Sequence, residues 1–109
     1  MSHENSEKIL QAMSREEIRA TFIELLNASQ CKRFNDITDE TIISERFPDM
    51  NDFDRGEIVL DVDLLFGIEI KDEEVSNPEE DEKNFGYSFK FKTIGEWCDY
   101  IAKKMNGKK

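Results

Sequence analysis

Few residues of this chain have the side chains that enzymes use as nucleophiles or bases. Among its 109 residues, His3 is the only histidine and lies in a polar run, while Cys31 and Cys98 are the only cysteines. A Ser-His-Asp or Cys-His pair requires an imidazole beside the nucleophile, and His3 is expected to be a solvated tail residue. No phosphate-cradling glycine loop is visible. We therefore predict that the protein is not an enzyme.

The residues that could bind metal do not form a known pattern. The cysteines are far apart, so both are expected to be thiols in a reducing cytoplasm, with Cys98 in the core. Segment 49–54 begins like a calcium loop, but Leu60 stands where the closing glutamate should be. A second acidic segment lacks such spacing and contains Asp72, Glu73, Glu74, Glu79, Glu80, Asp81 and Glu82. It is expected to be a solvated loop, and no metal or other cofactor is predicted.

The chain is strongly acidic, with 25 acidic and 15 basic residues and a formal charge of −10. Phosphate backbones and anionic membranes repel such a chain, so nucleic acid and anionic lipid are excluded as direct partners. No apolar stretch is long enough for a membrane span and no leader sequence is expected, which favours the cytoplasm. With 38% hydrophobic residues the chain is expected to form one globular domain. The charge predicts a protein partner with a basic face.

Two capping boxes mark the starts of helices. They open at Ser14 and Thr93, each with a glutamate three residues later, and predict helices near 15–28 and 94–105. A short helical turn is expected near 41–46, before Pro48. The sequence leaves open whether residues 1–13 are a polar tail or an extension of the first helix.

A middle helix is expected near 54–66, ended by Gly67. Its apolar residues share one arc and are expected to be buried; they are Ile58, Val59, Val62, Leu65 and Phe66. An acidic stripe runs along the edge of this arc, formed by Asp54, Glu57 and Asp61. Leu60 and Leu64 fall outside the arc, so solvent or a covering segment must contact them.

Two segments of the chain resemble acyl carrier proteins. Phe66–Glu74 reads Phe-Gly-Ile-Glu-Ile-Lys-Asp-Glu-Glu, and Phe91–Ile101 leads through Thr-Ile-Gly-Glu into the last helix. The resemblance covers most of residues 14–105. It implies an all-α bundle of three main antiparallel helices plus a short one.

This fold sets the expected domain organisation and core. The acyl-carrier-like domain is expected at 14–106, with an insertion at about 75–90 and a basic tail at 107–109. The expected core includes Ile18, Phe22, Leu26, Val59, Val62, Phe66, Phe91, Ile94, Trp97 and Ile101.

The chain departs from the family at its defining site. Acyl carrier proteins have Asp-Ser-Leu at the start of the middle helix, and the serine takes a phosphopantetheine arm from coenzyme A. Here Asp52 stands at the serine position, between Asn51 and Phe53. A carboxylate has no hydroxyl to attack the phosphate, so no covalent arm is expected. The alternative is a working carrier whose attachment serine is replaced here or lies elsewhere, such as Ser44.

The second departure is the insertion, whose later part alternates Phe85, Tyr87, Phe89 and Phe91 with small or polar residues. This is strand periodicity. Two interpretations stay open: an extended arm that packs on exposed apolar residues such as Leu64 and so caps the bundle or fills its cleft, or a ribbon exposed for a partner.

The resemblance also implies a partner surface on the middle helix. The positions that family members present to partner enzymes are Glu57, Leu60 and Asp63, and Leu64 replaces a residue that is commonly acidic there. Together with Asp54 and Asp61 they combine charge for steering with an apolar patch for affinity. We therefore expect a monomeric, noncovalent docking module for a protein with a basic, partly apolar surface. Its setting is expected to be fatty-acid or polyketide-type metabolism.

Overall fold

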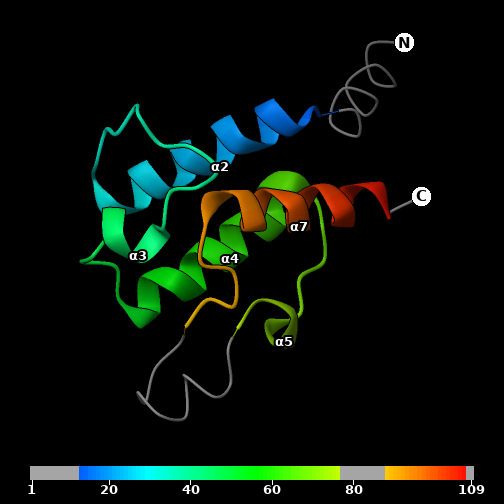
Figure 1. Ribbon diagram of the computed structural model, residues 1–109. Helices are drawn as coiled ribbons and strands as arrows, with labels where there is room; N and C mark the ends of the chain where they lie inside the picture. The colour runs from blue at the N-terminus through cyan, green and yellow to red at the C-terminus, as the bar shows by residue number, and fades with distance from the viewer. Residues whose placement is uncertain (1–12, 77–87, 108–109) are drawn as a thin grey trace.

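Five helices and their connections form the described part of the protein. The computed structural model describes residues 13–76 and 88–107. The helices are α2 (Arg15–Gln30), α3 (Ile43–Arg46), α4 (Asp52–Phe66), α5 (Asp72–Val75) and α7 (Ile94–Asn106) (Figure 1). These residues contain no strand, only isolated bridges that pair Ile42 with Thr93 and Ser76 with Phe89. The predicted all-α class is confirmed for this part of the chain.

The three long helices are not all antiparallel. In Figure 1, α2 runs from right to left, whereas α4 and α7 both run from left to right. The expected antiparallel arrangement therefore holds between α2 and each of the other two helices, and not between α4 and α7. Since α2 contacts both α4 and α7, it is the helix that joins them.

Each long helix begins at a capping box. The boxes predicted at Ser14 and Thr93 are present: their hydroxyls accept the N–H of the glutamate three residues later at 3.1 and 3.2 Å. α4 begins at Asp52 rather than 54, because Asn51 Oδ1 accepts the Asp54 N–H at 2.8 Å. Each cap satisfies a backbone donor that the first helical turn leaves free.

Two helices end at a residue in the left-handed conformation. Gly67 follows α4 with φ of 61°, as its position predicts. α2 continues to Gln30, beyond the expected end, and Cys31 follows with φ of 56°. The Lys32 N–H then donates to the Asn27 carbonyl at 2.8 Å, which satisfies one of the last free carbonyls of α2.

Trp97 is fully buried and stands at the centre of an aromatic cluster. The distances from its ring centroid to the ring centroids of three phenylalanines are 5.4 Å for Phe22, 5.0 Å for Phe89 and 5.4 Å for Phe91. The predicted core residues that are buried are Ile18, Phe22, Leu26, Val59, Val62, Phe66, Ile94, Trp97 and Ile101. Phe91 is only half-buried, because Phe89 of the same segment takes the buried place against Trp97.

The described part of the aromatic segment covers the core near Trp97. Phe89 is buried and forms its bridge with Ser76, and the Lys90 N–H donates to the Val75 carbonyl at 2.6 Å. Leu64 stays 78% exposed, so the expected packing of this arm on Leu64 is wrong for the described residues. Phe85 and Tyr87 lie outside the described residues, as do His3 and the acids at 79–82.

The first acids of the expected solvated loop form α5 instead. Val75 is fully buried, and Glu74 accepts hydrogen bonds from Tyr100 Oη at 3.0 Å and Lys104 Nζ at 3.2 Å, both on α7. The Lys71 N–H also donates to Glu74, and these bonds lower the pKa of its carboxyl. Anchoring by α7 explains why a turn forms here, so the described part has two short helices rather than one.

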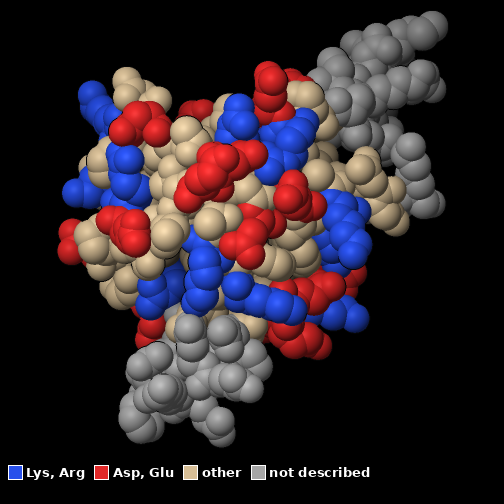
Figure 2. Space-filling view, in the orientation of Figure 1, with Lys and Arg blue, Asp and Glu red and all other residues tan. Residues whose placement is uncertain are grey.

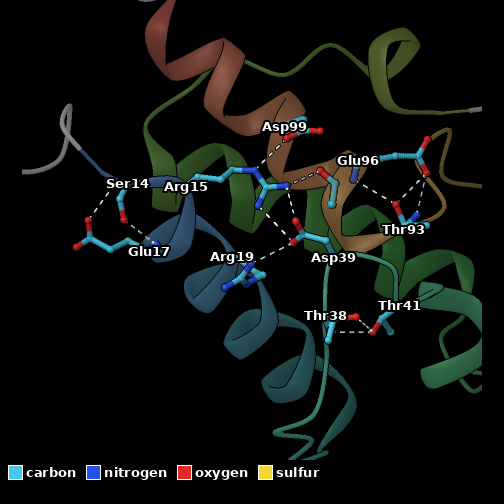
Figure 3. A network of polar contacts seen from close by, with 11 residues as sticks. Ser14, Arg15, Glu17, Arg19, Thr38, Asp39, Thr41, Thr93, Glu96 and Asp99 are labelled. Carbon is cyan, nitrogen blue, oxygen red and sulfur yellow. Dashed lines mark hydrogen bonds and ion pairs between the residues drawn. The ribbon is translucent and has the colours of Figure 1, made fainter.

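A charged network joins α2, the loop after it and α7 (Figure 3). Arg15 pairs with Asp99 of α7 at 2.9 Å and with Asp39 of the loop at 3.3 Å. The same guanidinium donates to the Gly95 carbonyl at 3.1 Å, and Arg19 pairs with Asp39 at 3.4 Å. Because the two carboxylates are occupied by arginines, this cluster holds the helices together and is not a candidate acid–base pair.

Candidate functional site on the outer face of helix α4

Helix α4 exposes most of the large apolar side chains that the described protein leaves open to solvent. Phe53 is 73% exposed, Leu60 65% and Leu64 78%; the others are Leu65, also on α4, and Ile42. A concentration of large apolar side chains on one helix is typical of an interaction surface, whereas isolated ones are ordinary. This helix is therefore the candidate site.

The spacing of these residues explains why they point away from the core. Ile58, Val59, Val62 and Phe66 are buried and define the inner side of α4. At 100° per residue, Phe53, Leu60 and Leu64 lie on the opposite side, together with Glu57. Leu60 and Leu64 lie outside the buried arc, as the periodicity predicts, and of the two possibilities left open it is solvent that they face.

Two acidic side chains accompany this apolar line. Glu57 and Asp61 are exposed, and neither side chain forms an ion pair or hydrogen bond with any described residue. We define the outer face of α4 by Phe53, Glu57, Leu60, Asp61 and Leu64. It offers apolar area together with two negative charges that remain available for a cation.

Asp54 and Asp63, expected on the partner surface, are half-buried and support the local fold instead. Asp54 accepts the Asn51 N–H in the capping box and the Gln30 amide at 3.2 Å from α2. Asp63 Oδ2 accepts the Ile70 N–H at 3.0 Å and so fixes the chain after α4. At 100° per residue both lie at the edges of the helix rather than on its outer face, and from there each carboxylate reaches a neighbouring backbone or side chain.

Asp52, at the position where the resemblance places an attachment serine, is the first residue of α4. Its carboxylate pairs with Arg55 Nη2 at 2.9 Å. A negative charge in the first helical turn also interacts favourably with the helix dipole. Asp52 therefore has a structural environment that suits a carboxylate.

Phe53 belongs to the outer face but is absent from the predicted surface. The signal that identifies it is its spacing: it precedes Leu60 by seven residues and Leu64 by eleven, which places all three on one helical line. For Leu65 the predicted burial is wrong. It was expected to be buried with Val62, yet 51% of it is exposed.

Net charge alone does not locate a binding surface on this protein. On the face shown in Figure 2, Lys and Arg side chains are interspersed with Asp and Glu, and neither sign covers it. In the charged network of Figure 3, acids and bases neutralise one another. The outer face of α4 differs because two acids that form no ion pair with a described residue lie beside three exposed large apolar side chains.

The other reactive groups do not assemble into a chemical site within the described residues. Burial raises the pKa of the Cys98 thiol to about 11, so it stays protonated at neutral pH, and Cys31 is exposed. No cluster of His, Cys, Asp and Glu in this part of the chain could hold a metal ion. Ser44 is exposed on α3, at the edge of a cavity of about 280 Å³ that Phe47 and Phe91 help to line.

Comparisons with known proteins do not identify a family. The chain matches no protein-family model, no curated protein and no solved structure. None of the described helices combines the length and the apolarity needed to cross a membrane.

Proposed function

We propose that this protein is an acyl-carrier-protein-like docking module that works without a covalent phosphopantetheine arm. It binds a protein partner through the outer face of α4. The setting we infer from the resemblance is fatty-acid or polyketide-type metabolism. The order of the capped helices, the Phe-Gly-Ile-Glu-Ile segment after α4 and the Thr-Ile-Gly-Glu start of α7 support the family assignment.

The observation that carries the docking function is the outer face itself. Phe53, Leu60 and Leu64 are each more than half exposed on one line of α4. Three large apolar side chains in water contribute nothing to the stability of the fold. Burying them against a partner contributes favourably to the free energy of binding. Glu57 and Asp61 next to them attract a partner with lysines or arginines around an apolar depression.

Kinetics of partner binding test this function. A protein that the native chain retains in a pull-down is first identified and purified. Glu57→Lys is then expected to slow association, because it reverses the charge that steers the encounter. Leu60→Ala is expected to speed dissociation about tenfold, because it removes apolar contact in the complex. Association should also slow as salt rises, since exposed charges are screened over about 8 Å at physiological ionic strength.

A charge-matched control separates steering by this face from a general effect of net charge. Glu16 is exposed on the side of α2 opposite its buried residues and has no partner among the described side chains. Glu16→Lys makes the same charge change as Glu57→Lys and should leave association nearly unchanged. Equal rates for the native chain, Glu57→Lys and Leu60→Ala would place the interface elsewhere and contradict the proposal.

The absence of an arm is a separate prediction. Incubation with coenzyme A and a broad-specificity phosphopantetheinyl transferase should leave the intact mass unchanged, because Asp52 offers no attacking hydroxyl. Mass spectrometry measures this directly. A mass increase by one phosphopantetheine would favour the alternative of a working carrier, and Ser44→Ala would show whether that serine is the site. Asp52→Ser restores the hydroxyl and serves as the comparison.

A further inference from the structure

A groove of about 480 Å³ lies between α2 and α4, beside the outer face. Its apolar lining consists of Leu25 and Ala28 from α2 and Leu65 from α4. Helical periodicity places Leu65 with the buried residues of α4, yet 51% of it is exposed. Closely packed helices would bury such a leucine. The groove therefore leaves room for a side chain from another molecule.

Acidic side chains stand on both sides of this groove. Glu24 lines it from α2 and Asp61 from α4, and the remaining lining residues, Thr21 and Ser29, are uncharged. Neither carboxylate forms an ion pair or hydrogen bond with a described residue. The groove thus has an apolar floor, a negative charge on each side and no positive charge in its lining. Such an arrangement is complementary to an apolar group flanked by cations.

We propose that the groove receives a basic amphipathic helix of the partner protein. A large apolar side chain of that helix enters between Leu25 and Leu65, and lysines or arginines beside it pair with Glu24 and Asp61. This inference rests on the proposed docking function, because Asp61 belongs to both the groove and the outer face. At 100° per residue, Asp61 lies between Leu64 and Leu65 around α4, so a single partner helix that lies along α4 at Asp61 contacts both the groove and the outer face.

Charge also argues against a second copy of this chain as the occupant. The chain has a net charge of −10, and an outer face placed on the groove would bring Glu57 and Asp61 against Glu24 and Asp61 of the other copy. Like charges at an interface oppose binding. The occupant must therefore supply the cations.

A synthetic helical peptide provides the probe. It has about four helical turns, leucines at i, i+3, i+4 and i+7, and lysines on both sides of the leucine stripe. Binding is measured by fluorescence anisotropy of the labelled peptide. Ala28→Leu fills the groove without changing charge, and Ala28 is exposed on a helix that tolerates leucine well. We expect this variant to bind the peptide about tenfold more weakly, because the anchoring side chain is excluded.

Matched variants separate the inference from the function on which it rests. Ala20→Leu makes the same change at an exposed position of α2 outside the groove and should bind the peptide like the native chain. Leu64→Ser probes the outer face alone. If Leu64→Ser weakens binding and Ala28→Leu does not, the groove inference is wrong while the docking function stands. The groove inference is also overturned if the peptide does not bind, or if neither variant alters its binding. The docking function is tested independently by the kinetics of partner binding.

Discussion

Replacement of Phe22 by alanine is expected to lower the free energy of unfolding by about 3–5 kcal/mol, the usual cost of removing a buried aromatic ring. Phe22 is fully buried on α2 and its ring lies 5.4 Å from that of Trp97 on α7. Truncation removes the apolar contact and leaves a cavity at the point where the two helices meet, since the surrounding side chains relax only partly. Urea unfolding followed by circular dichroism measures the loss.

Phe53→Ala is the matched control for this experiment. Phe53 has the same side chain but is 73% exposed on the outer face of α4. Its truncation should change stability by only about 0.5 kcal/mol or less, as for most surface substitutions. The same variant should instead weaken partner binding. Comparable destabilisation by the two substitutions would contradict the described arrangement of core and outer face.

Gly95→Ala is expected to destabilise the protein by about 1–3 kcal/mol, the typical cost of overpacking a close contact. A Cβ atom at Gly95 would lie 3.0 Å from Asp39 Cβ and 3.1 Å from the Asp39 carbonyl oxygen. The Gly95 N–H donates to that same carbonyl at 2.9 Å. Asp39 must therefore give way by a few tenths of an ångström, which strains this bond, the contact of Arg15 with Asp39 (Figure 3) and the contact of Arg15 with the Gly95 carbonyl.

Gly56→Ala is the control for the glycine substitution. Gly56 lies inside α4, and an added Cβ would meet no atom within 4 Å. Alanine has the higher helix propensity, so this variant should be more stable by about 0.5–1 kcal/mol. Thermal unfolding distinguishes the two, because 1 kcal/mol corresponds to roughly 4–8 °C in Tm for a domain of this size. A stabilising Gly95→Ala would contradict this prediction and show that the loop at Asp39 yields to the added methyl group without cost.

Local patterns in the sequence were sufficient to locate the long helices and much of the core. The capping boxes at Ser14 and Thr93 act within one helical turn, so their residues alone predict where α2 and α7 begin. Periodicity likewise separates the buried Val62 from the exposed Leu60 and Leu64, because it depends only on the geometry of a single helix.

Only the tertiary structure decided the features that depend on distant segments. Leu65 is exposed because α2 and α4 leave a groove between them at this point. No pattern within α4 encodes the position of α2. α5 forms because Tyr100 and Lys104 of α7 bind Glu74. Asp54 and Asp63 resemble surface acids in the sequence. In the structure their carboxylates accept hydrogen bonds from Gln30 and from the Ile70 N–H, which both lie outside α4. A short stretch of sequence determines the helix propensity and the periodicity of its own residues. Which side chains are buried and which charges are paired depends on residues that folding brings from elsewhere in the chain.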